Sequence, residues 1–294
     1  MVTSSSSFPA PLARGDFDTT ARTDGPLGVP GTTRPRHVGM TAPALVEQVE
    51  RALGASRGRI VKLTSDGETV WVKRPRRGPG YTLYGLHFGA AQSLGICLFR
   101  PPRVSRGSSG LAAEAKRLAH LQGKGWPVPR VLAITPRWLA LSDNGPSLSD
   151  VVAGLEVQER SRMLRAALEF LQTLHAQQGW HGAAQMRNLT RLQDGFGAID
   201  FEDDVEPAMP LQSRQARDIY LFLISAARYA GRDELLVPHL LDDALGRASA
   251  AVYDELRSVG AKLVRAERML GWIAPYLGRD GPALSAIARA FRGR

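Results

Sequence analysis

Several features that define common protein classes are scarce or missing in this sequence. Cys97 is the only cysteine among 294 residues, so no disulfide can form within the chain. Aromatic residues make up 7% of the sequence, and no helix-turn-helix, zinc-finger spacing or aromatic-rich sheet motif points to nucleic acid. The six histidines show no paired metal-ligand spacing. The mean hydropathy of -0.17 argues against a protein with several membrane spans.

Acidic residues are also missing from one long stretch. The sequence has 38 Lys and Arg against 28 Asp and Glu, a net charge of +10 that favours anionic partners. No acidic residue occurs from 73 to 113, and the basic residues of that stretch are Lys73, Arg74, Arg76, Arg77, Arg100, Arg103 and Arg106. Within it, residues 78–99 carry leucines at three- and four-residue steps, which predicts an apolar helical face flanked by arginines. We expect an insertion (78–108) that packs on its own domain or contacts an anionic membrane surface.

The first 40 residues differ in composition from the rest. They are rich in Ser, Thr, Gly and Pro and show neither helical nor strand periodicity, so residues 1–40 are predicted to be a disordered tail. Four Arg and three Asp nearly cancel in this tail, and it therefore does not account for the charge of +10.

The remaining residues predict a strand-rich front half and a helical back half. In the front half we expect helices at 42–53 and 110–122, and strands at 59–64, 69–74, 131–134 and 138–141. The Asp66-Gly67 step between the first two strands is a strong hairpin signal. In the back half the periodicity predicts helices at 156–178, 211–229, 233–245, 248–270 and 282–291. This order indicates an α+β fold with segregated layers.

Four short features follow one another along the chain. Lys73 ends a predicted strand, and Glu114 lies near the apolar side of a predicted helix. His181 and Asn188 then fall in one loop, and Asp200 follows a short apolar run. Taken singly, these residues are ordinary surface charges, helix pairs or turn-capping groups. Their order and spacing together are typical of phosphotransferases.

In this order the chain resembles the protein-kinase-like superfamily, and most closely the bacterial lipopolysaccharide (Kdo/heptose) kinase-related proteins. The resemblance covers roughly residues 42–229. The residues that carry it are 71–75 (Trp-Val-Lys-Arg-Pro), the long insertion that ends in 99–102 (Phe-Arg-Pro-Pro), the hinge-like 143–148, 199–204 (Ile-Asp-Phe-Glu-Asp-Asp) and Arg217-Asp218.

The resemblance implies a two-lobed fold that binds ATP and Mg²⁺. It implies a small β-rich N-lobe (41–142) and a larger helical C-lobe (143–294), with the nucleotide between them. Lys73 and Glu114 would hold the phosphates, helped by a loop that contains Gly54 and Gly58. The implied catalytic set is His181, Asn188 and Asp200: Asn188 and Asp200 would hold Mg²⁺ through hard oxygen atoms, while His181 would support the loop.

Three positions depart from the pattern of active kinases. Ala183 stands where the proton-accepting Asp is expected, Glu202 replaces a glycine, and the glycine-rich loop has only Gly54 and Gly58. Two functions follow. One is an ATP-dependent kinase acting on a hydroxyl of a lipopolysaccharide, a glycolipid or a protein. The other is a pseudokinase that serves as a nucleotide-binding or membrane-surface module. For both we expect a cytoplasmic protein, peripheral at the inner membrane in the membrane-contact case.

Overall fold

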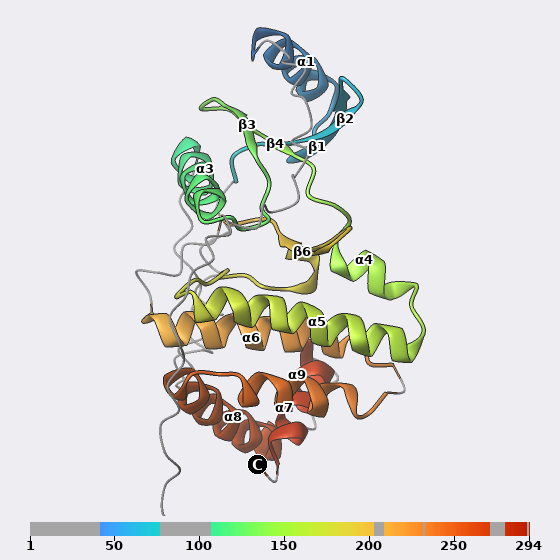
Figure 1. The fold of residues 1–294 in the computed structure, drawn as a ribbon, viewed down its shortest axis with the longest axis vertical. Coiled ribbons are helices and arrows are strands. Elements are labelled where there is room, and N and C mark those ends of the chain that lie inside the picture. The colour runs from blue at the N-terminus through green and yellow to red at the C-terminus, as the bar shows by residue number, and fades with distance from the viewer. Residues whose placement is uncertain (1–41, 77–106, 203–208, 232, 271–279, 293) are drawn as a thin grey trace, which may run out of the picture. The chain divides into compact units, whose positions relative to one another are not determined.

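The computed structural model describes residues 42–76, 107–202, 209–231, 233–270, 280–292 and 294. The tail expected at 1–40 lies outside these residues, and so does the insertion expected at 78–108 apart from its last two residues. The described chain is an α+β protein with a small antiparallel sheet in its front part and a helical remainder, as the sequence predicts (Figure 1).

The sheet has four antiparallel strands in the order β1-β2-β4-β3. Their bounds are β1 Ile60–Ser65, β2 Glu68–Lys73, β3 Val131–Ile134 and β4 Leu139–Ser142. Asp66 and Gly67 form the turn between β1 and β2 with positive φ angles of 51° and 78°, the conformation that the Asp-Gly step favours. A two-residue turn fixes the register of the hairpin, and Ile60 therefore lies opposite Lys73.

Helix α1 (Ala42–Ala55) packs on this sheet and forms a small core with it. Trp138 is fully buried there, and its indole Nε1 donates a hydrogen bond of 2.8 Å to Glu50. The buried apolar residues of this core are Leu45, Val49, Leu53, Val70, Val72, Trp138 and Ala140.

Helix α3 (Ser108–Gly123) begins two residues before the predicted helix. Leu111, Leu118 and Leu121 are buried and belong to the main core of the molecule. Glu114 is buried with them although it is ionisable, which brings a carboxylate to the inner side of α3.

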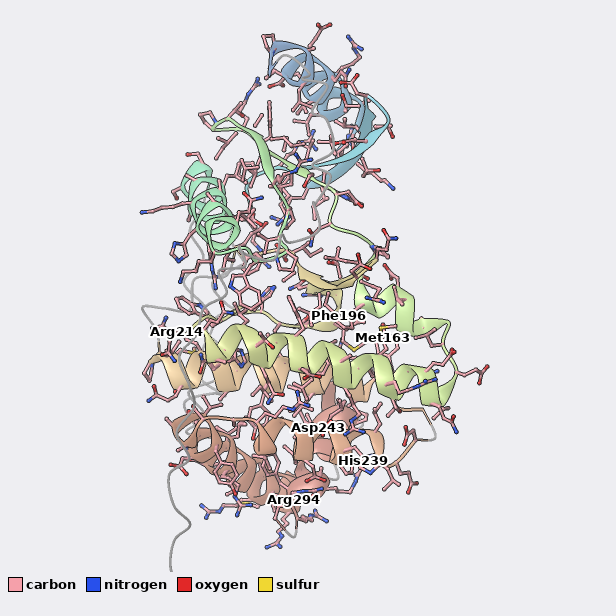
Figure 2. The ribbon with its side chains drawn as sticks, viewed as in Figure 1. Met163, Phe196, Arg214, His239, Asp243 and Arg294 are labelled. Carbon is pink, nitrogen blue, oxygen red and sulfur yellow. The ribbon has the colours of Figure 1, made fainter. Side chains whose placement is uncertain are left out.

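The helical remainder holds the rest of the main core, and α5 and α6 lie side by side within it (Figure 1). Its elements are α4 Leu148–Ala153, α5 Val157–Ala176, the 3-10 helix η2 Met186–Asn188, β5 Leu189–Leu192, β6 Gly195–Ala198, α6 Leu211–Ala227, α7 Leu236–Gly246, α8 Ala250–Leu270 and α9 Asp280–Phe291. Arg165 of α5 forms an ion pair with Asp243 of α7 at 2.6 Å (Figure 2). None of the described helices is long and apolar enough to span a bilayer.

Residues 143–147 join the sheet to the helical remainder along a fixed path. Trp71 donates from Nε1 to Asp143 at 2.7 Å, and the Asn144 amide donates to Thr190 of β5 at 3.1 Å. Gly197 of β6 lies so close to Asn144 that an added Cβ would come within 2.5 Å of its amide nitrogen. The hairpin β5–β6 is therefore held at a fixed position against the end of β4.

Candidate active site

The end of β2 places a buried lysine among three carboxylates from distant parts of the chain. The Lys73 ammonium Nζ lies 2.7 Å from Glu114 Oε1 of α3 and 2.7 Å from Asp200 Oδ1, which follows β6. A third carboxylate, Glu202, approaches Nζ to 3.3 Å. The Lys73 side chain is 8% exposed and that of Glu114 is 0% exposed, so water contributes little to the solvation of this pair.

The charges in this cluster shift one another's pKa values. Burial opposes the charge on Lys73, but the three carboxylates outweigh it and raise the pKa of the ammonium above its usual range. Burial also opposes ionisation of Asp200, yet Lys73 prevails and lowers the pKa of that carboxyl. For Glu114 burial is the stronger effect and raises the pKa despite the contact with Lys73. Lys73 is therefore a firmly charged cation, and burial makes Glu114 costly to ionise.

Asp200 adopts a backbone conformation that is rare for a residue with a side chain. Its φ is 66°, in the left-handed region that costs a non-glycine residue about 1–2 kcal/mol. Strain of this kind is found where the position of a side chain matters for function. At Asp200 the conformation accompanies an Oδ1 atom that contacts Lys73, in a side chain that remains 35% exposed.

His181 ties the loop after α5 to the segment that carries Asp200. Its Nε2–H donates to the carbonyl of Ile199 at 3.0 Å and its Nδ1 accepts from the Ala183 amide at 3.2 Å, which assigns the neutral Nε2–H tautomer. Burial lowers the pKa of the ring, in agreement with that neutral form. The imidazole also stacks on the Phe201 ring, with 4.4 Å between centroids. His181 thus holds the backbone on both sides of Asp200.

Asp218 of α6 anchors the same loop by accepting hydrogen bonds from its backbone. Its carboxylate accepts hydrogen bonds from the backbone amides of His181 at 2.5 Å and Gly182 at 2.7 Å, and it lies 3.3 Å from His175 Nε2. Burial opposes its charge, but the hydrogen bond from His175 and further contacts lower the pKa of Asp218. A fully buried carboxylate therefore stays ionised and fixes the path of the loop.

Asn188 lies beside the Asp200 segment. Its Nδ2 donates to the carbonyl of Ala183 at 2.8 Å, and its backbone carbonyl accepts from the Ile199 amide at 2.9 Å. With Nδ2 turned to Ala183, the side-chain Oδ1 is the atom of Asn188 that remains for a ligand. Ala183 itself offers only a methyl group at the position where the resemblance expects an acid.

The predicted glycine loop has a different setting from the other site residues. Gly54 lies in the last turn of α1, and Gly58 lies in the linker between α1 and β1. The carbonyl of Gly58 accepts a hydrogen bond from the Arg74 guanidinium. The structure brings Lys73, Glu114 and Asp200 together, whereas the role of Gly54 and Gly58 in binding phosphate stays a prediction.

Sequence reasoning missed one charged residue of the cluster. Arg59 Nη1 lies 2.8 and 3.0 Å from the two carboxylate oxygens of Glu202, which itself contacts Lys73. The hairpin register contains the signal for this position, because Arg59 precedes Ile60 and Ile60 lies opposite Lys73.

The donor atoms of this cluster fit a magnesium ion. Carboxylate oxygens of Glu114, Asp200 and Glu202 lie within 4.8 Å of one another. Glu114 Oε2 is buried and has no hydrogen-bond partner among the described residues. These carboxylate oxygens are hard ligands, which Mg²⁺ prefers, and the amide oxygen of Asn188 is a ligand of the same kind. Asp200 is the most exposed of the three carboxylates, which favours it as the ligand that a metal reaches first.

Two further features are a group of aromatic rings with arginines over them and a cavity. Arg214 at the start of α6 (labelled in Figure 2) lies over the Trp180 ring, 4.2 Å from its centroid. Arg117 of α3 lies over both Trp180 and Phe201, 5.2 Å from each ring centroid. A cavity of about 1070 Å³ is lined by the end of α6, by α7 and by α9. No residue that the sequence predicts for the site lines that cavity.

Comparisons with known proteins yield distant structural likenesses. No protein-family model matches the sequence, and a search of curated proteins finds no relative. The structure is similar to a choline kinase from Cryptosporidium parvum Iowa II, with 9% identity, a TM-score of 0.32, and coverage of 86% of this chain and 95% of the other. It is also similar to Rv3197 from Mycobacterium tuberculosis, solved as a complex with erythromycin, with 17% identity, a TM-score of 0.33, and coverage of 85% and 80%. Likenesses this weak carry no argument about activity.

Proposed function

We propose that this protein is an ATP-dependent phosphotransferase with a two-lobed kinase-like fold, whose nucleotide site is built around Lys73. The observation that carries the proposal is the convergence of Glu114 and Asp200 on the Lys73 ammonium, each at 2.7 Å, from positions 41 and 127 residues away. A positioned cation beside oxygen ligands for a metal is the arrangement that phosphoryl transfer requires.

Each residue of the cluster has a definite task in this proposal. Lys73 binds nucleotide phosphate oxygens, and Glu114 holds its ammonium in place from the buried side of α3. Asp200 and Asn188 are the residues that would hold Mg²⁺, which supplies charge neutralisation for the phosphates when it is bound. His181 and Asp218 touch none of these groups and act as positioning residues, because they fix the backbone around Ala183 and Asp200.

On the sequence resemblance alone, the acceptor is a hydroxyl of a lipid-linked saccharide or of a protein, at the inner face of a membrane. Ala183 cannot accept the proton of that hydroxyl. Transfer would then depend on the alignment of the reactants and on charge stabilisation, which supply most of the catalysis in phosphoryl transfer.

The same alanine favours a second candidate function. A chain that keeps Lys73, Glu114, Asp200 and Asn188 but lacks the base retains the groups for binding and loses one for turnover. A pseudokinase, which binds Mg²⁺·nucleotide without turnover and serves as a nucleotide-binding or membrane-surface interaction module, is therefore the alternative.

Thermal denaturation with and without Mg²⁺·ATP tests nucleotide binding. At a nucleotide concentration about 100 times Kd, linkage stabilises the native state by about 2.7 kcal/mol, a rise in Tm of roughly 5–11 °C for a chain of this size. Lys73→Ala and Asp200→Asn should abolish the rise, and Arg51→Ala, in an exposed pair with Glu47, should keep it. A wild-type protein whose Tm does not respond to Mg²⁺·ATP would refute the proposal.

Turnover then separates the two candidates. A protein that binds Mg²⁺·ATP and transfers the γ-phosphate to a glycolipid extract or a generic protein substrate is a kinase. Binding without transfer, under conditions where Ala183→Asp does transfer, identifies the pseudokinase.

A further inference from the structure

Arg59 is the second cation that points into the Lys73 cluster. It lies one residue before β1, in the linker that follows α1, and its side chain is 33% exposed. Its Nη1 contacts both oxygens of Glu202, which lies on the other side of the site, 143 residues later. The Glu202 side chain is only 12% exposed, so the contact is shielded from solvent more than a surface ion pair is.

The linker that carries Arg59 is fixed by another arginine. The Arg74 guanidinium donates to the carbonyls of Leu53 at 2.5 Å, Ser56 at 2.8 Å, and Gly58. The Arg74 backbone amide also donates to the Arg59 carbonyl at 2.8 Å. These bonds tie the linker to the end of β2, and Arg59 is therefore held at the site without help from a ligand. Preorganisation of this kind lowers the entropy cost of binding.

Glu202 is an anion shared by two cations. Its Oε1 lies 2.8 Å from Arg59 Nη1 and 3.3 Å from Lys73 Nζ. A carboxylate between a guanidinium and an ammonium occupies the kind of position that a phosphate group takes, because both cations bind the two anions through the same donors. Glu202 thus fills, from within the chain, a place suited to a phosphate oxygen.

We infer that Arg59 is a second phosphate-binding residue of the nucleotide site, and that Glu202 is the internal anion that a nucleotide phosphate displaces. This inference rests on the proposed function. Arg59 would contact the phosphates from the α1–β1 linker and would do part of the work of a glycine-rich loop. Binding of nucleotide would then compete with the Arg59–Glu202 and Lys73–Glu202 contacts.

Two substitutions should change nucleotide affinity in opposite directions. Arg59→Ala removes a charge-assisted contact and should weaken Mg²⁺·ADP binding about 10-fold to 100-fold. Glu202→Gln removes the competing charge at nearly constant volume and should tighten it, by about fivefold or more. Arg59→Lys keeps a charge without the planar fork and should lie between the wild type and Arg59→Ala.

The experiment is a calorimetric titration of the full-length variants with Mg²⁺·ADP and, separately, with adenosine. Adenosine has no phosphate, so a phosphate-binding role predicts that Arg59→Ala leaves adenosine affinity unchanged. Arg51→Ala serves as the matched control, because Arg51 is a 73% exposed arginine that pairs only with its helix neighbour Glu47 among the described residues. The Tm of each free variant shows that it is folded.

The outcomes distinguish failure of the inference from failure of the proposed function. Equal Mg²⁺·ADP affinity of wild type and Arg59→Ala, or an equal loss for adenosine, overturns the inference and leaves the proposed function standing. Weaker Mg²⁺-dependent binding by Glu202→Gln also overturns it and makes Glu202 a metal ligand. Binding that is tighter in Glu202→Gln than in wild type, with the gain lost when Arg59→Ala is added, supports it. No binding by wild type or Glu202→Gln overturns both.

Discussion

Replacing Lys73 by methionine should destabilise the fold through Glu114. The change removes the ammonium at nearly constant volume and leaves a carboxylate whose side chain is 0% exposed without its cation. Asp200 and Glu202 are 35% and 12% exposed, so the loss of the cation costs them less free energy. Glu202 also keeps its contact with Arg59. Removing one partner of a buried ion pair costs about 3–5 kcal/mol. At about 2–4 °C per kcal/mol, Tm should fall by roughly 6–20 °C.

The loss should depend on pH in a definite direction. Burial raises the pKa of Glu114 above its ordinary value of 4.5 even beside Lys73, and loss of the ammonium raises it further. A carboxyl with a raised native pKa favours the folded state below its unfolded pKa, and this contribution disappears as the pH rises through the native pKa. Lys73→Met should therefore cost more at pH 8 than at pH 5.

Urea unfolding followed by far-UV circular dichroism at pH 5 and pH 8 measures both effects. The double variant Lys73→Met/Glu114→Gln removes the stranded charge and should recover at least half of the loss at pH 8. Arg51→Ala, in an exposed pair, should unfold as the wild type does. The reasoning fails if Lys73→Met unfolds at the same urea concentration as Arg51→Ala at both pH values, or if the double variant is no more stable than the single one.

Three further predictions concern the loop and the membrane. Asp218→Ala leaves two buried backbone amides without an acceptor and should cost about 2–6 kcal/mol in urea unfolding at pH 7. Because the native pKa of Asp218 is lowered, this loss of stability should shrink as the pH falls below the ordinary pKa of 3.8. A loss of stability that is constant with pH would contradict this. Ala183→Asp should raise the rate of phosphate transfer about 100-fold if the acceptor hydroxyl lies near residue 183, whereas an unchanged rate in a competent assay would place it elsewhere. Combined replacement of Arg100, Arg103 and Arg106 by serine should reduce co-sedimentation with anionic vesicles, and unchanged binding would exclude this arginine group as the contact.

Periodicity and turn chemistry predict most elements of the fold because they are local signals. The hairpin at Asp66-Gly67 and the long amphipathic helix α5 follow directly from residue type and spacing. Helix α4 was not predicted: its six residues are too few for a helical period, and it depends on the Ser147 cap that accepts from Asp150 at 3.2 Å. Strand β5 was missed because its four residues pair with β6 across a two-residue turn without an alternating pattern.

The site residues also divide into those that the sequence predicts and those that depend on contacts between distant segments. Order along the chain singles out Lys73, Glu114 and Asp200, which the structure brings to 2.7 Å contacts. The part played by Arg59 depends on a path of the linker that Arg74 fixes through three backbone carbonyls, and such contacts leave no periodic trace in a sequence. Glu202 was identified only as a departure from a glycine, while its two cationic partners become evident only in three dimensions.

The charge balance of the cluster links the two candidate functions. When all groups are ionised, Arg59 and Lys73 face Glu114, Asp200 and Glu202, so two cations meet three carboxylates and one negative charge remains. Such a cluster repels a bare nucleotide and attracts a divalent cation first, which would neutralise carboxylates and leave the two cations to a phosphate. This requirement concerns binding and holds whether or not a base stands at position 183. A chain that has lost the base therefore still has a physical reason to keep all five charges, and the affinity for Mg²⁺·nucleotide, measured before turnover, is the property that tests the site itself.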